Sequence, residues 1–326
     1  MDRRRVAAQA GTWRAARCAG LSLVELLVAL AIGVALSFAA VNVLLHSKQS
    51  YFAAEELARI QDNGRYALRY LSHELAMAGY LATELPATDI KTKLHGSSCF
   101  DHLLVTTVAL EHLDDVSRAG LAAGGTATLP ADCLLPGKHV PTSDVLLTRR
   151  AASAPAAGAV DSSAIYLWIT PTHEQPQTQR GGDGVTSAND LWEYRPQVLF
   201  LRDYSVVAGD GTPALCRKRL GRSSNRMAPT QCLLEGVENM QIEFGIDDDG
   251  DRRADRFEPA PDAEDLRRAV AARIYLLLRS LNPIAGHIDD RAYALGATFV
   301  APAMDRYYRR LMQTTVLLRN PAGLKL

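Results

Sequence analysis

The sequence predicts an α+β protein in which one long N-terminal helix packs on an antiparallel β-sheet. Apolar residues recur at spacings of mostly three or four up to about Ala78, which is the spacing of an α-helix. Beyond that point the pattern changes to short apolar runs separated by polar segments rich in glycine and proline, as in strands and turns. One long helix followed by strands favours an α+β fold over alternating helices and strands.

The chain begins with a basic segment and continues with an apolar one. Residues 1–20 contain five arginines and a single acid, Asp2, whereas residues 21–45 contain only one charged residue, Glu25. About 25 apolar residues, each rising 1.5 Å along a helix, can span a hydrocarbon core of ~30 Å. Arginines on the leading side keep that side in the cytoplasm. We therefore expect residues 21–45 to span a membrane and the rest of the chain to be extracytoplasmic.

The position of the small residues sets this segment apart from an ordinary secretory signal, which is cut after a short apolar core. Here the attractive small-residue site, Ala19-Gly20, precedes the apolar run, so cleavage would leave that run on the mature chain. Glu25 needs an explanation, because a carboxylate inside an apolar helix costs about 2.5–3.5 kcal/mol on insertion scales. It either has a function or lies at the membrane interface, where water solvates it.

Residues 20–28, with the sequence GLSLVELLV, resemble the class III signal of type IV prepilins and of type II secretion pseudopilins. The resemblance implies that a prepilin peptidase removes residues 1–20 by cutting after Gly20 and that Leu21 becomes a methylated N-terminus. Leu21 stands where the family usually has phenylalanine. The resemblance also implies that Glu25, the fifth mature residue, is the assembly residue. Its carboxylate would neutralise the amine of Leu21 on a neighbouring subunit and thereby fix the axial register between the two.

The helix changes character after the apolar segment. Over residues 46–80 the apolar positions lie on one face and charged residues occupy much of the opposite face, so this half should pack on a sheet. Gly79 is a suitable C-terminal stop. The apolar positions are Phe52, Leu57, Ile60, Ala67, Leu68, Leu71 and Leu75.

Residues 81–326 are expected to form one β-rich head. We interpret Ala151–Ala159 as a surface loop, and Pro171–Asn189 and Asp247–Pro261 as polar separators between strands. The expected strands are Leu103–Leu110, Val145–Arg149, Ile165–Thr170, Gln197–Val207, Leu215–Leu220, Val237–Ile246, Ala272–Ser280 and Met312–Arg319.

Three segments of the C-terminal half resemble the PilW-type minor pilins: residues 234–245, 272–280 and 308–320. The resemblance implies a pilin-like fold and a low-abundance subunit that helps to initiate type IV pilus assembly, with roles in twitching motility or adhesion. It implies other minor and major pilins, the prepilin peptidase and an inner-membrane assembly platform as partners. The chain would first lie in the inner membrane, with a single span and a periplasmic head, and later in the fibre at the cell surface.

The cysteine count agrees with export. Removal of the leader removes Cys18 and leaves four cysteines, for which three pairings are possible. We favour Cys99–Cys133 and Cys216–Cys232, because sequence neighbours close the shortest loops, and each bond would stabilise the fold by about 2–4 kcal/mol. Four unpaired thiols in a cytosolic protein are the alternative. No CxxC spacing indicates a zinc or redox site.

An acidic segment follows the expected strand at residues 237–246. Its carboxylates alternate as they do in a loop that wraps around calcium, and the glutamate falls twelfth, where an EF-hand has its bidentate ligand. Arg252 stands at the sixth position, where such a loop needs glycine, and the alternative is a solvated acidic turn neutralised by arginines. Calcium is the one cofactor that the sequence suggests. The candidate ligands are Asp247, Asp249, Asp251, Asp255 and Glu258.

Enzyme motifs are lacking. His173-Glu174 has no second histidine of a zincin, and Gly181–Gly184 is not followed by the lysine of a phosphate loop. We therefore expect a non-enzymatic subunit. The formal net charge of zero gives no reason to expect nucleic acid as a partner, and the arginine-rich segment Cys216–Arg226 is interpreted as a solvated hairpin face. The alternatives are a minor pseudopilin of a type II secretion system and a membrane-anchored binding or enzymatic domain.

Overall fold

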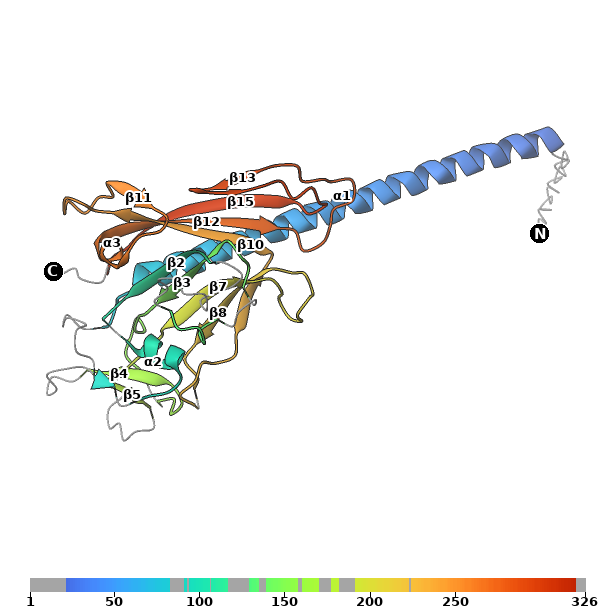
Figure 1. Ribbon diagram of the computed structural model, residues 1–326. Helices are drawn as coiled ribbons and strands as arrows, with labels where there is room; N and C mark the ends of the chain where they lie inside the picture. The colour runs from blue at the N-terminus through green and yellow to red at the C-terminus, as the bar shows by residue number, and fades with distance from the viewer. Residues whose placement is uncertain are drawn as a thin grey trace, which may run out of the picture. The chain divides into compact units, whose positions relative to one another are not determined.

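The structure of the chain is a computed structural model (Figure 1). The chain forms two compact units, Met1–Phe52 and Ala53–Leu326, and each is considered separately below. The structure describes residues 22–82, 91–92, 94–105, 107–116, 129–134, 139–157, 160–169, 177–181, 191–222 and 224–320.

The first element is a helix of 55 residues, α1 (Leu23–Met77). Within the described residues it is the one helix long and apolar enough to cross a membrane. It ends as the sequence predicts: Gly79 has a φ of 81°, in the region that glycine adopts without strain, and its N–H donates to the carbonyl of Arg149 at 2.9 Å. A side chain at position 79 would also meet the carbonyl of Asn320 and Cβ of Ala109.

Two antiparallel sheets form the main part of the second unit. One sheet has four strands in the order β11-β10-β12-β15 and is called the four-stranded sheet below. The other has five strands in the order β2-β3-β7-β8-β9 and is called the five-stranded sheet. The strands of the first are β10 (Val237–Ile246), β11 (Arg256–Glu258), β12 (Ala269–Arg279) and β15 (Arg309–Leu317). Those of the second are β2 (Leu110–Val116), β3 (Ser143–Thr148), β7 (Gln197–Arg202), β8 (Ala214–Arg219) and β9 (Gln231–Glu235).

Smaller elements complete the head. A third sheet has the order β1-β5-β4-β6, in which β1 and β5 are parallel, and β13 pairs with β14 in a hairpin. Two short helices, α2 (Ser98–Leu104) and α3 (Ala263–Arg268), lie between strands. The small strands are β1 (Lys91–Thr92), β4 (Ile165–Trp168), β5 (Gln177–Arg180), β6 (Leu191–Glu193), β13 (Tyr293–Leu295) and β14 (Thr298–Val300).

One hydrophobic core joins the second half of α1 to both large sheets. Leu71 and Leu75 of the helix are buried in the same cluster as Leu199 of β7 and Ile274 of β12. The sheets also touch directly, because the N–H of Ile242 on β10 donates to the side chain of Asp144 on β3 at 2.7 Å. The buried helix residues are Glu56, Ile60, Gly64, Ala67, Leu68, Leu71, Glu74 and Leu75. The fold is therefore α+β, with the helix packed on antiparallel sheets, as the sequence predicts.

Several local predictions are wrong, and the expected separators 171–189 and 247–261 each contain a strand, β5 and β11. The expected strand Leu103–Leu110 is not formed, because Leu103 and Leu104 end α2, which the side chain of Ser97 caps by accepting the N–H of Phe100, and β2 begins only at Leu110. The expected loop Ala151–Ala159 begins inside the fold, since Ala151 is fully buried and bridges to Tyr194. The expected strand Gln197–Val207 ends at Arg202, and the residues that follow form a loop.

Gly64 is required for the close approach of α1 to the four-stranded sheet. A Cβ at this position would overlap Sδ of Met312 on β15 and lie 3.1 Å from Cδ1 of Leu278 on β12. We therefore expect Gly64→Leu to lower the free energy of unfolding by about 1–3 kcal/mol, the usual effect of overpacking. Chemical unfolding of the full chain in detergent, followed by near-ultraviolet circular dichroism, measures this change.

The same helix provides the matched control. A Cβ at Gly33 meets no atom within 4 Å, so Gly33→Leu makes the same substitution in α1 without overpacking. Equal unfolding free energies for the two variants would contradict the close-packing role of Gly64.

Candidate functional site

The beginning of α1 is closed by two reciprocal hydrogen bonds. The N–H of Ser22 donates to Oε2 of Glu25 at 3.0 Å, and the N–H of Glu25 donates to Oγ of Ser22 at 3.3 Å. This is a capping box, which satisfies two main-chain donors at a helix start. Glu25 thus has a local structural role that the sequence analysis missed, although the spacing Ser-x-x-Glu indicates it. Gly20 and Leu21 lie outside the described residues.

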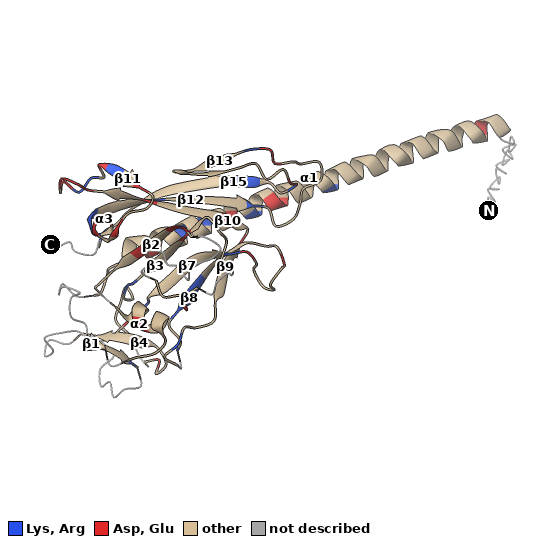
Figure 2. Cartoon of the chain, viewed as in Figure 1, with Lys and Arg blue, Asp and Glu red and all other residues tan. Residues whose placement is uncertain are grey.

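The helix segment after Glu25 is apolar on all sides and exposed along its length. Leu36 is 65% exposed and Phe38 is 70% exposed, and Figure 2 shows this half of α1 free of charge except for one acidic position near its start. The hydroxyl of Ser37 is satisfied within the helix, since it donates to the carbonyl of Gly33 at 2.8 Å. Such a surface needs lipid or other helices around it.

The acidic segment after β10 forms a compact loop. Asp247 holds the loop in place, because its carboxylate accepts the N–H groups of Gly250 at 2.6 Å and Arg252 at 2.9 Å. Burial acts to raise the pKa of Asp247, but these main-chain bonds outweigh it and lower the pKa. Asp249 and Asp255 each bring an oxygen within 4.8 Å of an oxygen of Asp247.

Three of the five expected calcium ligands are therefore together, and two lie apart from them. Glu258 is on β11, where Arg256 binds its carboxylate at 3.3 Å, and Asp251 accepts the N–H of Arg253 at 2.8 Å. Arg256 also pairs with Asp248. The structure thus contains the arginine-neutralised turn, and calcium at this loop stays a prediction.

A second carboxylate cluster, which the sequence analysis missed, lies where the two large sheets meet. Asp114, Asp115 and Asp144 each place an oxygen within 4.8 Å of the others. Asp144 is buried and accepts from Nε2 of His112 at 2.9 Å and from the N–H of Ile242. Partial burial, together with the charge of Asp144, raises the pKa of Asp114 to about 6. Only the adjacent acids at 114 and 115 signal this cluster in the sequence.

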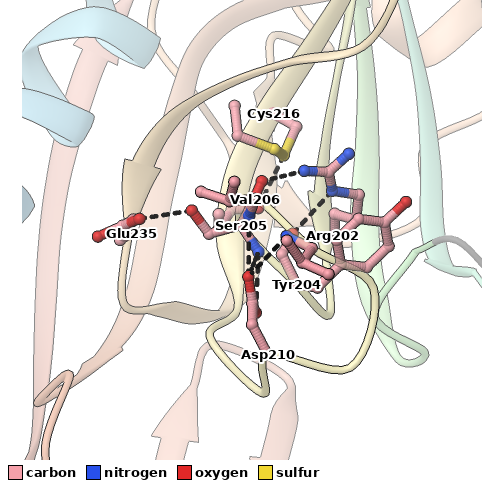
Figure 3. The surroundings of a disulfide bond; sticks show 10 residues. Arg202, Tyr204, Ser205, Val206, Asp210, Cys216 and Glu235 are labelled. Atoms are coloured by element: carbon pink, nitrogen blue, oxygen red, sulfur yellow. Dashed lines mark hydrogen bonds between the residues drawn. A yellow bond between two sulfur atoms is a disulfide. The ribbon is translucent and has the colours of Figure 1, made fainter.

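The cysteines form the favoured pairs. Cys99 of α2 is bonded to Cys133, and Cys216 of β8 is bonded to Cys232 of β9. Figure 3 shows the second disulfide beside the β7–β8 loop, where the carboxylate of Asp210 accepts the N–H groups of Thr212 and Val206, both at 2.9 Å. These bonds lower the pKa of Asp210 to about 2.

The arginine-rich segment near β8 is occupied by local contacts. Arg217 binds Oε1 of Gln231 at 3.1 Å and the hydroxyl of Tyr70 at 2.9 Å. Arg222 pairs with Asp161. Arg217 and Arg222 are thus engaged within the chain, and the interpretation of this segment as a solvated hairpin face stays a prediction.

Comparison with known proteins bears on the C-terminal part of the head. Residues 203–320 match the family model of the type IV pilus-assembly protein W, PilW. In this segment the chain is PilW-like. The match spans β8 to β15 and contains all three of the segments that resemble PilW in the sequence. Over these residues the head resembles a type IV pilus-assembly protein.

Two further comparisons add nothing to this assignment. No curated protein matches the chain. Among solved structures, the chain is similar to a type IV-like pilin from Thermus thermophilus, at 14% identity and a TM-score of 0.37, over 81% of this chain and 98% of that one. A TM-score this low carries no inference about the chain.

The raised pKa of Asp114 predicts a pH-dependent effect of Asp114→Asn. A carboxyl that binds its proton more tightly in the folded state contributes no destabilisation below the unfolded pKa of about 4 and its full destabilisation above the folded pKa of about 6. Asp114→Asn should therefore raise the free energy of unfolding near pH 7.5 by about 1 kcal/mol, a value reduced for solvent screening. The gain should vanish as the pH falls towards 4.

Urea unfolding of both proteins at pH 4 to 8 measures this difference. Asp290→Asn, at an exposed position, is the control. A gain of the same size at pH 4 and pH 7.5 would show that ionisation of Asp114 is not its cause.

Proposed function

We propose that the chain is a minor pilin that helps to initiate assembly of a type IV pilus. The observation that supports this most directly is the exposed apolar half of α1, residues 23–45, in which Glu25 is the one carboxylate. The PilW-like segment of the head supports the same role and favours a pilus over a type II secretion fibre. The role is structural, and no catalytic step is part of it.

The proposed pathway begins in the inner membrane. The apolar half of α1 spans the bilayer, with the basic leader in the cytoplasm and the head in the periplasm. Prepilin peptidase cuts between Gly20 and Leu21 and methylates Leu21. The assembly platform then moves the subunit into contact with other minor and major pilins. The calcium loop, with Asp247, Asp249 and Asp255, is a secondary proposal for stabilising the extracytoplasmic head.

Glu25 can both cap its own helix and bind a neighbour. The N–H of Ser22 donates to Oε2 of this carboxylate. No described residue donates a hydrogen bond to the other oxygen, Oε1. A neighbouring subunit's N-terminal amine could bind that second oxygen. In a medium of low dielectric, such a pair relieves two unfavourable charges at once and fixes the axial register.

The face of α1 around Gly33 suits close contact with other helices in a fibre. Ala29, Gly33 and Ser37 follow one another at intervals of four, so they lie on one side of the helix. Small residues in this arrangement allow helices to approach closely in an apolar medium. The helix would thus leave the lipid for the fibre core without exposing its apolar surface to water.

The N-terminus of the membrane-extracted protein tests the first step. We expect the mature chain to begin at Leu21 and to be one methyl group heavier than the sequence requires, but only in cells that contain prepilin peptidase. Intact mass and N-terminal peptide sequencing, with and without the peptidase, give the answer. An uncut chain, or a cut beyond the apolar segment, would contradict the proposal.

Glu25→Gln tests the carboxylate separately from the cap. Glutamine also forms a capping box, so the variant keeps the helix start and loses only the charge. We expect its amount in sheared fibres, relative to membranes, to fall by about tenfold or more, the effect of a 1.4 kcal/mol loss in contact free energy. Quantitative immunoblotting of both fractions measures this ratio.

Ser22→Ala is the matched control. It removes the hydroxyl cap, at about 0.5–2 kcal/mol of helix stability, and keeps the carboxylate. We expect it to enter fibres normally. If Glu25→Gln enters fibres as well as Ser22→Ala does, then α1 is only an anchor.

A further inference from the structure

The strand β15 is an unusually open edge of the four-stranded sheet. It is the last strand of that sheet and pairs with β12 from Arg309 to Leu317 without a register shift. A long, regular edge strand offers its main-chain groups to any extended chain, and proteins usually shield such edges with charges, proline, bulges or short length.

The main-chain N–H and C=O groups of β15 point alternately towards β12 and away from it, and this alternation shows which of them lack a hydrogen-bond partner. The N–H of Leu318 donates towards β12, to the carbonyl of Val270, so every second residue before it also points towards β12. The residues between them point outward, and the outward carbonyl of Arg309 is already bound by Arg291 at 3.1 Å. The remaining outward residues have no hydrogen bond on that side within the described chain: Leu311, Gln313, Thr315 and Leu317.

The other edges of the two large sheets are shielded. β11 has only three residues and carries Arg256 and Glu258. β2 has a register shift and carries Asp114 and Asp115. β9 has a shift in its pairing with β8, and α1 binds its outer edge, since Asn63 donates to the carbonyl of Glu235 at 3.1 Å. Lack of shielding is therefore specific to β15 among these edges.

The charges beside this edge define what it can bind. Residues 311–317 carry no charge, and Leu317 is 68% exposed. Arg310 and Arg319 lie exposed at the two ends of this stretch, and neither forms an ion pair within the described chain. The two residues are about 30 Å apart along an extended chain.

We propose that the free edge of β15 receives an extended segment from a neighbouring pilin-like subunit. The segment adds a strand to the sheet, with an uncharged centre opposite residues 311–317 and acidic side chains opposite Arg310 and Arg319. Main-chain hydrogen bonds supply the contact, and the charges select the segment and fix its register. That the segment comes from a pilin rests on the proposed function, whereas the chemistry of the edge does not.

A peptide probe tests the edge itself. The probe is a ten-residue peptide, Glu-Thr-Val-Thr-Val-Thr-Val-Thr-Val-Glu, whose two glutamates are nine positions apart, as Arg310 and Arg319 are, and its control has lysine at both ends. Hydrogen exchange of the full chain in detergent is measured with each peptide. We expect the glutamate-ended peptide to slow exchange about tenfold at the outward amides of Gln313, Thr315 and Leu317. No protection, or equal protection by both peptides, would overturn the proposal.

One pair of variants and one double variant sharpen the test. Thr315→Pro removes an outward N–H without removing a bond to β12, and Thr315→Val keeps that N–H. We expect the first to abolish protection by the peptide and the second to retain it. The double variant Arg310→Glu/Arg319→Glu changes two exposed side chains and should bind the lysine-ended peptide instead of the glutamate-ended one. Because this result does not depend on Thr315→Pro, the proposal stays testable even if Thr315→Pro fails to fold.

Exchange in the assembled state separates this inference from the proposed function. If the chain enters fibres but the outward amides of β15 exchange as fast there as in the free protein, then the edge is not the contact, and the pilin proposal stands. If the peptide protects the edge but the chain never enters a fibre, then the strand-addition chemistry stands and the pilin proposal fails.

Discussion

The head depends on one buried ion pair between α1 and the five-stranded sheet. Arg150, just after β3, binds both carboxylate oxygens of Glu74 at 2.7 Å, and both side chains are more than nine-tenths buried. Burial alone would lower the pKa of Arg150, and the bonds to Glu74 raise it. Because loss of one partner from such a pair costs about 3–5 kcal/mol, the two must be buried together. Their pairing fixes the position of the helix along the sheet, and Gly64 then lies against β12 and β15.

The length of each element decides how well the sequence predicts it. Long elements repeat their pattern often enough to be recognised, so α1 and β10 are predicted nearly to the residue. Elements as short as β11 or α2 contain too few residues for a period to show. Ala151 looks like part of a loop because its segment is rich in alanine, but pairing with Tyr194 buries it. That tertiary contact has no local signal.

The candidate site residues also differ in whether the local sequence indicates them. Glu25 is conspicuous in the sequence because it is the one charge in an apolar segment, and its capping bond to Ser22 follows from a spacing that can be read locally. The cluster of Asp114 and Asp144 could not be predicted, since it forms only when β2 and β3 pair and β10 packs beside them. The contacts of the acidic loop also lack a local signal, because the sequence does not show that Arg256 pairs with Glu258.

The two proposed contacts of the chain constrain different degrees of freedom. A charge pair at Glu25 is a single point on a cylindrical helix, so it can set the axial position of a subunit but leaves rotation about the helix axis open. A strand added to β15 makes several main-chain bonds in a fixed direction, so it sets the orientation of the head but leaves axial slip by two residues open, unless charges at Arg310 and Arg319 forbid it. Each contact thus supplies what the other lacks. A subunit that starts a fibre needs both, because it has no complete turn of neighbours to hold it in place.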